Sequence, residues 1–574
     1  MKLSKTLFPP LKKTILFACI LVSITALAFR DDLFQASKNL EIFASVYKEL
    51  NINYVDEINS SKMMRAGIDA MLDDLDPYTE YVPESDVEDY RMKYVSTQYG
   101  GVGATIMSRN GRIYISDPYQ GFPAQKADIR AGDELVQING ITLKGKPNDE
   151  VSTLLKGPKS TPIKLLINRP GETKTIEKNI AREEITQPNV SYYGVVGGNV
   201  GYIKLDKFLE NSAQEVKDAL VNLRKNNINS LVLDLRYNGG GILQEAVKIV
   251  NLFVNKDILV VTQKGRNAEK TIPYRTFQAA AEPTLPLVVL VNNRSASASE
   301  IVAGSLQDLD RAVIIGQRSF GKGLVQQTFS LPYNSLVKVT VAKYYTPSGR
   351  CIQALDYTHR TTEGNVEKVA DSLITEYKTA DGRSVYDGSG IYPDLVIPAP
   401  KYSQITQTLV SKYYIFDYAT KFRNANPSIT EPKTFKLTDA QYAEFVSYLS
   451  DKDYNYSTQT EKMLTTLQKE AEKDRKMTEI KPEFDALKSK VFYSKKNDLT
   501  QFKGEIRQVL ENEIVSRYYF QKGRLETGFK YDNDLKKAIN VLSDKVMIAS
   551  ILKGEGTYKT IGKPGEDFSA NAGK

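Results

Sequence analysis

The chain has 574 residues, of which 41% are hydrophobic and 25% charged, and its formal net charge at pH 7 is +8. This is the composition of ordinary globular domains, and the length is enough for three or four of them. The 77 basic residues are balanced by 69 acidic ones and form no basic block interleaved with aromatics, which argues against nucleic-acid binding. Two cysteines, Cys19 and Cys351, and one histidine, His359, cannot assemble a cysteine–histidine metal site, so the sequence favours chemistry without a cofactor.

Residues 1–29 have the pattern of an export signal. An uncharged, mostly apolar run at 14–29 is short for a membrane span, and Ala26-Leu27-Ala28 fits an A-x-A cleavage site. We expect a signal peptide, with an uncleaved inner-membrane anchor as the alternative and lipid attachment at Cys19 less favoured. Either way, the rest of the chain is predicted to reach the periplasm or an equivalent envelope space. The lysines that precede the run are Lys2, Lys5, Lys12 and Lys13.

Residues 30–94 are predicted to form an N-terminal helical segment. Apolar side chains recur at helical spacing between Leu40 and Leu50 and again between Met63 and Leu75, and Asp76-Pro77 ends the second pattern. Residues 95–185 alternate in strand fashion instead, with hairpin signals at Asn110-Gly111 and Asn139-Gly140, which predicts a β-rich domain.

Residues 186–400 alternate strand and helix patterns, which predicts an α/β core with a mainly parallel sheet and helices packed on it. Within it, a buried strand at 286–291 leads through the small-residue turn 295–299 into a helix at 300–308. Such an elbow raises a serine to the C-terminal edge of a sheet, beside a helix N-terminus that favours negative charge. Further strands are predicted at 199–208 and 312–315, a helix at 212–225, and a strand, glycine turn and helix at 230–254.

A serine nucleophile needs a base. His359 lies in a polar stretch that we interpret as an exposed loop, which disfavours a Ser-His-Asp triad and leaves a Ser-Lys pair as the natural alternative. Lys322 stands between Gly321 and Gly323, and no acid lies between Asp310 and Lys322. A lysine acts as a base only where burial lowers its pKa, and this segment permits burial.

The elbow and the lysine together carry a family resemblance. SASASEIVAG followed by RSFGKGLVQQ resembles the carboxy-terminal processing, or tail-specific, serine peptidases. The resemblance implies that Ser297 is the nucleophile, that Lys322, 25 positions later, is the general base, and that Gln326 orients the lysine. It extends to the stretches 337–353 and 388–398 and covers roughly residues 40–400.

Acyl transfer also needs backbone donors for the oxyanion. The resemblance places them at the N–H groups of Ala298 and Gly240, because the family pattern DLRxNPGG aligns Gly239 with its proline. The missing proline leaves the register between Gly240 and Gly241 open. A phosphate cradle is disfavoured, because the turn lacks the Lys-Ser/Thr ending of a P-loop.

Two patches in the β-rich region, 100–104 and 132–143, with 121–133 between them, resemble a PDZ domain. A PDZ domain captures an extended peptide by strand addition and holds its terminal carboxylate with backbone N–H groups. The resemblance implies that the carboxylate-binding loop consists of Gly101, Val102, Gly103 and Ala104.

Two further positions are interpreted as structural. Asp308 matches a family position, and we expect it to support the fold. Cys351 stands where the family has a serine, and we expect a small, buried, inert thiol, because His359 offers it no partner.

Residues 401–574 are predicted to form a C-terminal helical domain without chemistry of its own, ending in a disordered tail from 562. Its helical patterns lie at 439–449, 462–476 and 505–519.

The sequence thus predicts a multidomain α/β protein: an exported serine endopeptidase with a Ser-Lys dyad and a PDZ domain that binds protein C-terminal tails. The partners are protein or peptide substrates, with inner-membrane anchoring and a homodimer through the terminal helical segments as further hypotheses. The first alternative is a catalytically inert PDZ-bearing envelope adaptor. The second is an esterase or amidase for a small molecule, which would leave the PDZ domain without a purpose.

Overall fold

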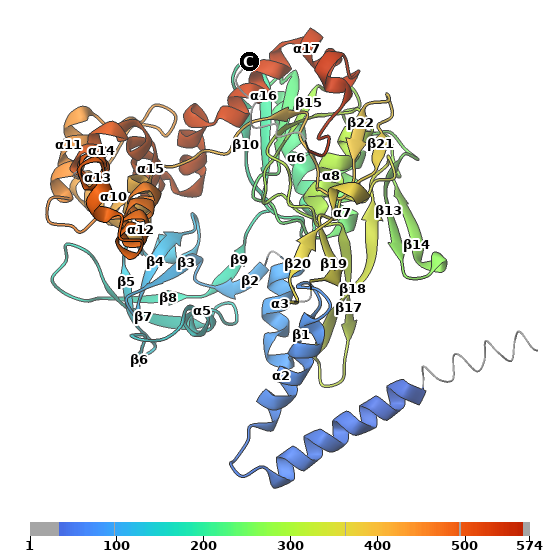
Figure 1. The fold of residues 1–574 in the computed structure, drawn as a ribbon, viewed down its shortest axis with the longest axis horizontal. Helices are drawn as coiled ribbons and strands as arrows, with labels where there is room; N and C mark the ends of the chain where they lie inside the picture. Colours follow the sequence, from blue (N-terminus) through green and yellow to red (C-terminus); the bar gives the residue numbers. More distant parts are fainter. Residues whose placement is uncertain (1–33, 97, 362, 493–494, 566–574) are drawn as a thin grey trace, which may run out of the picture. The chain divides into compact units, whose positions relative to one another are not determined.

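The computed structural model describes residues 34–96, 98–361, 363–492 and 495–565. The chain forms two compact units, one extending to Glu84 and including Thr328–Val339, the other made of Ser85–Gln327 and the chain from Thr340 onward (Figure 1). The predicted export signal at 1–29 lies outside the described residues. No described helix is both long enough and apolar enough to span a membrane.

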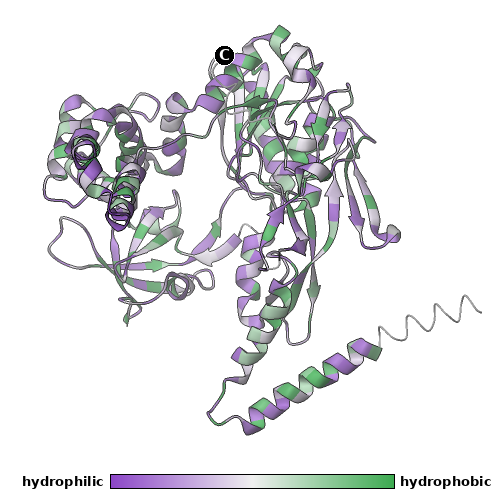
Figure 2. Ribbon diagram, in the orientation of Figure 1, coloured by the Kyte–Doolittle hydropathy of each residue, from purple (hydrophilic) through white to green (hydrophobic). Residues whose placement is uncertain are grey.

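The first unit contains the two predicted N-terminal helices. One runs over residues 34–53, and α2 (Ser60–Asp73) begins where Asn59 accepts a hydrogen bond from the N–H of Lys62. The strand β1 (Glu80–Val82) pairs antiparallel with the start of β18 (Leu336–Tyr345). Helix 34–53 leaves many large apolar side chains exposed, which makes it an uncovered apolar surface. Its ribbon carries several hydrophobic positions (Figure 2).

The β-rich domain of the second unit follows α3 (Val87–Tyr94) and is built on an antiparallel sheet of order β3-β4-β5-β7-β8, with β6 beside β5. The predicted turns are confirmed: Asn110 and Asn139 both have positive φ and are followed by glycines that do too. The strand β2 (Gln98–Gly101) pairs with β9 (Glu183–Thr186) at the entrance to the domain. The other elements are β3 (Ala104–Arg109), β4 (Arg112–Pro118), α4 (Pro123–Lys126), β5 (Glu134–Ile138), β6 (Ile141–Thr142), α5 (Asn148–Leu155), β7 (Pro162–Asn168) and β8 (Ile176–Ala181).

The α/β core is organised around a six-stranded sheet of order β10-β11-β12-β15-β16-β23. Its strands from β11 to β23 are parallel, and β10 pairs antiparallel with β11 at the edge. The strands are β10 (Val190–Val196), β11 (Val200–Leu205), β12 (Ser230–Asp234), β15 (Leu287–Val291), β16 (Val313–Gly316) and β23 (Leu395–Val396).

Helices cover both faces of this sheet. On one face, Leu231 and Leu233 of β12 pack in a cluster with α6 (Ser212–Lys225), α7 (Leu243–Asn251) and α8 (Ala298–Asp308). On the other, Val232 packs with α16 (Asn533–Ser543) and α17 (Lys545–Leu552) (Figure 1). Because successive strand residues point to opposite faces, this alternation produces three layers. The second helical layer therefore comes from the far end of the sequence.

The expectation of a mainly parallel core is not confirmed for residues 186–400 as a whole. Parallel ladders among the described strands are confined to the central sheet, and most of the remaining strands of the region pair antiparallel. Several of these strands are neighbours joined by short turns, which permit only an antiparallel partner, whereas a parallel pair needs a crossover. They are β13 (Leu259–Gly265), β14 (Thr271–Arg275), β17 (Leu324–Ser330), β18, β19 (Leu355–Arg360), β20 (Val366–Lys368), β21 (Glu376–Lys378) and β22 (Ser384–Tyr386).

Residues 404–528 form a helical domain with its own apolar cluster around Phe445 and Ile506. The predicted helices are confirmed as α11 (Asp439–Tyr448), α12 (Gln459–Lys473) and α15 (Lys503–Gly528). Phe520, with φ 54° and ψ −152°, kinks α15. The other helices are α9 (Gln404–Ser411), α10 (Tyr414–Ala425), α13 (Met477–Val491) and α14 (Lys496–Gln501).

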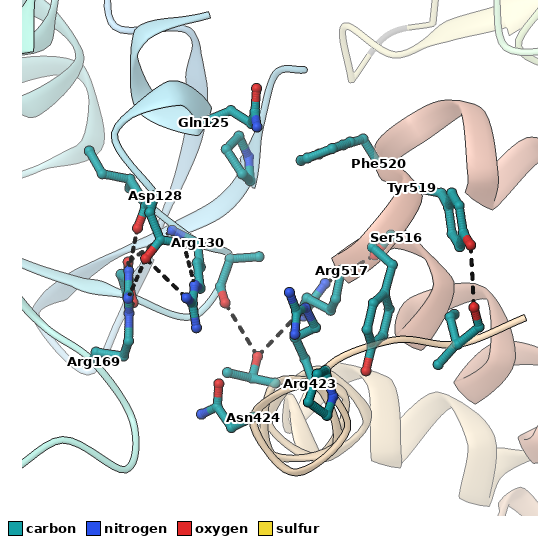
Figure 3. A pocket seen from close by; sticks show the side chains of 18 of the residues that line it. Gln125, Asp128, Arg130, Arg169, Arg423, Asn424, Ser516, Arg517, Tyr519 and Phe520 are labelled. Carbon is teal, nitrogen blue, oxygen red and sulfur yellow. Dashed lines mark hydrogen bonds and ion pairs between the residues drawn. The ribbon is translucent and has the colours of Figure 1, made fainter. Parts of the chain in front are cut away.

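The helical domain packs on the β-rich domain. Arg109, at the end of β3, forms a two-pronged ion pair with Asp417 of α10 at 2.8 and 2.9 Å. A cavity of about 420 Å³ is lined by residues of both domains (Figure 3). Several of its charged groups are engaged: Arg169 binds Asp128 and Asp133, and Arg517 binds a glutamate one turn earlier in α15. The cavity is therefore a polar part of the interface between the β-rich domain and the helical domain.

Candidate active site

The strand–helix elbow, residues 292–297, raises Ser297 as predicted. Ser297 has φ 58° and ψ −114°, a left-handed backbone that costs energy for any residue with a Cβ and persists only where its surroundings enforce it. Two hydrogen bonds of Ser295 fix the elbow just before it: Ser295 Oγ donates to the Leu235 carbonyl and accepts from the Asn292 N–H. Ser297 is partly exposed between buried Ala296 and Ala298.

The glycine turn, residues 238–241, lies directly against this elbow. The carbonyl of Asn238 accepts hydrogen bonds from Ala296 N–H at 3.0 Å and from Ser299 Oγ at 2.8 Å. Gly240 has φ 93°, and a Cβ built on it would lie 2.7 Å from Ser297 Cβ and 2.8 Å from Ala298 N. Only glycine fits at this position, so the turn and the elbow form one surface.

The candidate oxyanion donors differ in their hydrogen bonds. Within the described chain, the N–H of Ala298 has no acceptor, as expected at the first position of a helix. The N–H of Gly240 donates to its neighbour Asn238 Oδ1 at 2.9 Å, so it must be shared or released before it can bind an oxyanion. Gly241 lies instead against the Phe208 carbonyl, away from this contact with the elbow. Of the two glycines, Gly240 is the one that touches Ser297.

Lys322 lies on the lysine loop, residues 317–323, between β16 and β17, and its side chain is half-buried. Its N–H donates to Glu300 Oε2 at 2.9 Å, and its carbonyl accepts from the Tyr344 hydroxyl at 2.6 Å. Both of these side chains also contact Ser297, whose N–H lies 2.8 Å from Glu300 Oε2 and whose carbonyl lies 3.1 Å from the Tyr344 hydroxyl. The structure thus brings the backbones of Ser297 and Lys322 together through two shared partners.

Glu300 has no solvent exposure and accepts two more hydrogen bonds, from Ser319 Oγ and from the Gly321 N–H. Burial raises the pKa of this carboxyl group to about 7, although the four hydrogen bonds oppose the shift. Sequence reasoning assigned no role to Glu300 or Tyr344. A signal for Glu300 is present, since Ser297 and Glu300 have the S-x-x-E spacing of a helix capping box.

The remaining site predictions are placed as follows. Gln326, on β17, donates from Nε2 to Thr340 Oγ1 at 3.1 Å. Asp308 is buried and accepts hydrogen bonds from Arg350 at 2.7 Å and from a neighbouring backbone N–H, in keeping with a structural role. Burial raises the pKa of the Cys351 thiol, which favours its unreactive protonated form.

The expectation that His359 lies in a loop is wrong. It lies on β19, which pairs with β20, because the polar residues around it occupy a two-stranded hairpin with solvent on its faces. Its side chain is nonetheless 84% exposed, and its ring nitrogen lies 2.8 Å from Asp356.

An ion cluster adjoins the glycine turn. Arg236, two residues before Asn238, contacts buried Asp234 at 2.6 Å and also Asp532 and Asp534 at the start of α16, at 2.6 and 3.0 Å. Burial opposes ionisation of Asp234, but Arg236 and Lys204 outweigh it and leave its pKa below the ordinary value. No group of three or more potential metal ligands that could hold an ion occurs in the described chain.

The predicted carboxylate loop, Gly101 to Ala104, joins β2 to β3. The carbonyls of Val102 and Gly103 are tied inward by backbone N–H groups, whereas their own N–H groups have no acceptor in the described chain. Gly103 has φ 74°, and a Cβ on it would lie 2.4 Å from Phe122 Cβ. Among the described strands β3 pairs only with β4, so its other edge is open to a peptide strand beside α5.

A partly exposed serine on a helix-capping elbow, with its backbone held close to that of a lysine, in a chain that also has a β domain with an open strand edge, defines the class of serine peptidases that carry a peptide-capture domain. Family models support this class. The model for peptidase family S41 matches residues 199–361, the PDZ domain model matches 93–168, and the model for the C-terminal helical domain of probable PDZ-proteases matches 405–542.

Curated relatives narrow the class to a family. The chain is similar to "Probable CtpA-like serine protease" of Staphylococcus haemolyticus (strain JCSC1435), with 33% identity over 377 residues, 66% of this chain and 68% of that protein. The same-named protein of Staphylococcus aureus (strain MRSA252) is 35% identical over 369 residues, 64% of this chain and 66% of that protein. The chain belongs to the C-terminal processing peptidases of family S41. The match spans slightly less than two thirds of the S. aureus relative's length.

Among solved structures, "Photosystem II D1 C-terminal processing protease" aligns with 30% identity, 54% of this chain, 89% of that chain and a TM-score of 0.31. The PDZ domain of the carboxy-terminal protease from Vibrio cholerae, in complex with peptide, aligns with 27% identity over 16% of this chain and 99% of that chain, with a TM-score of 0.15.

Proposed function

We propose that this family member is an exported serine endopeptidase that binds the C-terminal tail of a protein substrate at its PDZ domain and cuts the chain with a Ser297–Lys322 dyad. The observation that carries the proposal is the pair of shared partners, Glu300 and Tyr344, that bring the backbones of these two residues together. Residues 25 positions apart are otherwise under no constraint to meet.

In the proposed reaction, the neutral amine of Lys322 takes the proton of Ser297 Oγ as this oxygen attacks the scissile carbonyl. The N–H groups of Ala298 and Gly240 bind the oxyanion. The ammonium of Lys322 then gives its proton to the leaving amine as the C–N bond breaks. Water, deprotonated by Lys322, attacks the acyl-enzyme, and Ser297 regains its proton. Gln326 orients the amine from β17.

The PDZ domain delivers the substrate. We propose that a tail adds as a strand to the open edge of β3 and that its carboxylate binds the N–H groups of Gly101 to Ala104. The N–H groups of Val102 and Gly103, which have no acceptor in the described chain, support this assignment.

Residues 1–29 are proposed to export the chain to the periplasm or an equivalent envelope space, as a signal peptide or a retained anchor. We also propose that the domains meet near residues 94, 185 and 400. The exposed apolar side chains of helix 34–53 support a contact with a second copy of the chain, which sedimentation of the wild type and of a chain lacking this helix would test.

The test compares wild type with Ser297→Ala, Lys322→Ala and the exposed-lysine control Lys217→Ala on an unstructured protein with a free, apolar C-terminus. Cleavage is followed by electrophoresis and folding by circular dichroism. The proposal expects cleavage by wild type and Lys217→Ala only, and slower cleavage when the substrate tail is amidated. Binding of the tail by all variants without cleavage by any would favour the adaptor function, and an active Lys322→Ala variant would return His359 to consideration as the base.

A further inference from the structure

The nucleophile and the base are held from two sides by the same two buried side chains. On one side, Glu300 Oε2 accepts the N–H of Ser297 at 2.8 Å and the N–H of Lys322 at 2.9 Å. On the other, the single hydroxyl proton of Tyr344 is shared between Lys322 O at 2.6 Å and Ser297 O at 3.1 Å. Glu300 is completely buried, and Tyr344 is 1% exposed.

The two side chains come from elements that are distant from each other in the sequence. Glu300 lies in the first turn of α8, where its charge also interacts favourably with the helix dipole. Tyr344 lies near the end of β18, and its own N–H donates to the carbonyl of Gly323 in the lysine loop at 2.9 Å. Each therefore belongs to a regular secondary-structure element, and each contacts both the elbow and the lysine loop.

The two anchors act on N–H and C=O groups respectively. A residue whose N–H and C=O are both hydrogen-bonded cannot rotate about φ or ψ without losing one of these bonds. Proton transfer from a serine hydroxyl needs the amine within about 3 Å, and a displacement of about 1 Å costs on the order of 10²-fold in rate. The positions of the two backbones therefore determine how readily the proton is transferred.

We infer that Glu300 and Tyr344 are positioning residues that act as a clamp, setting the separation and orientation of Ser297 and Lys322 for proton transfer. This inference rests on the proposed function of the dyad. The four hydrogen bonds of the clamp go to backbone N–H and carbonyl groups of Ser297 and Lys322. Its loss should lower the rate of the acylation step while leaving tail binding intact.

The alternative is that the two side chains only stabilise the fold. Matched variants separate the two. Tyr344→Phe removes one hydroxyl, and its control Tyr442→Phe removes an equivalent buried hydroxyl that donates to the Leu499 carbonyl at 2.6 Å in the helical domain. Glu300→Gln has Glu511→Gln as its control, since Glu511 is also fully buried and hydrogen-bonded to a backbone N–H.

The experiment measures kcat and KM on a tailed protein substrate, the melting temperature, and the rate of covalent labelling of Ser297 by a fluorophosphonate probe. Tyr344→Phe is expected to lower kcat about tenfold and Glu300→Gln about 10²-fold, with KM unchanged within about twofold. Labelling should slow in parallel. The controls should lose comparable thermal stability and keep wild-type kcat.

Glu300→Gln/Tyr344→Phe completes the test. Because both residues hold the same pair of backbones, the double variant should lose less activity than the product of the single losses. Wild-type kcat and labelling in the folded single variants overturn the clamp. Equal kcat losses in the controls overturn it as well, because stability alone then explains the effect. Ser297→Ala is assayed in parallel. If this variant cleaves the substrate, the proposed function is wrong, and the clamp that rests on it is wrong as well.

Discussion

The guanidinium of Arg236 lies 2.6 Å from the carboxylate of Asp532, although the two residues are 296 positions apart. Arg236 precedes the glycine turn, and Asp532 caps α16 by accepting the N–H of Leu535. The part of the chain after the helical domain thus contributes directly to the ion cluster beside the candidate oxyanion site.

Asp532→Asn tests this connection. Asparagine keeps the helix cap but removes the charge, so Arg236 loses one strong partner while Asp234 and Asp534 remain. We expect kcat to fall about tenfold through a less fixed glycine turn, and stability to fall by about 1–3 kcal/mol. Asp451→Asn, at an exposed ion pair, is the control and should change neither. An unchanged kcat in Asp532→Asn would separate the cluster from catalysis.

Two adjacent glycines give a matched pair at the turn. Gly240→Ala places a Cβ 2.7 Å from Ser297 Cβ in a backbone with φ 93°, whereas a Cβ on Gly239 meets nothing within 4 Å. We expect Gly240→Ala to lower kcat by about 10²-fold or more, because it displaces the elbow and the donor together. Gly239→Ala should stay within about twofold of wild type. Steady-state kinetics and circular dichroism check both, and equal activity of the two variants would contradict the geometry.

The raised pKa of Glu300 predicts that stability and activity change in opposite directions with pH. Its pKa is about 7 in the folded chain against an ordinary value of 4.5, so the native state binds this proton more tightly than the unfolded state. The stabilisation from the bound proton is complete below about pH 4.5 and is lost as the pH rises to about 7, at most about 3 kcal/mol.

Activity should rise over the same interval, because only the ionised carboxylate accepts all four hydrogen bonds. The difference in melting temperature between wild type and Glu300→Gln should shrink or change sign between pH 5 and 8. The rise in activity near pH 7 should be absent from Glu300→Gln. A wild-type stability that rises through this interval relative to Glu300→Gln would refute the assignment.

The carboxylate loop offers a similar comparison. Gly103→Ala forces a Cβ to within 2.4 Å of Phe122, while Gly121→Ala has a comparable φ, 85° against 74°, and open space. Both variants carry the strain of a left-handed alanine, about 1–2 kcal/mol. Only Gly103→Ala should weaken binding of a free-tailed peptide, by about tenfold or more, as measured by calorimetry and by KM. Equal binding by both variants would move the carboxylate site elsewhere.

Much of this architecture could be predicted because its signals are local. The elbow at Ser297, the left-handed Asn-Gly turns and the amphipathic helices 439–449 and 505–519 follow from spacing and turn chemistry over a few residues. The antiparallel sheet containing β13 and β18 was missed, because these two strands are far apart in the sequence and nothing in either one indicates the other as its partner.

The clamp and the ion cluster could not be predicted for a different reason. The capping spacing identifies Glu300 as a partner of Ser297, but its reach to the lysine loop depends on how α8 and β16 pack. Nothing near Asp532 in the sequence indicates Arg236, and nothing in α16 indicates which face of the sheet it covers. These contacts exist only in the folded chain.

The second helical layer has a consequence for the timing of activity. A ribosome makes Ser297 and Lys322 more than two hundred residues before α16 and α17. Until those helices arrive, the apolar face of the sheet that includes Val232 has no cover and Arg236 has no Asp532. A half-made chain therefore carries Ser297 and Lys322 in an incomplete scaffold. We therefore expect the proposed peptidase to become active only once α16 and α17 have folded onto the sheet.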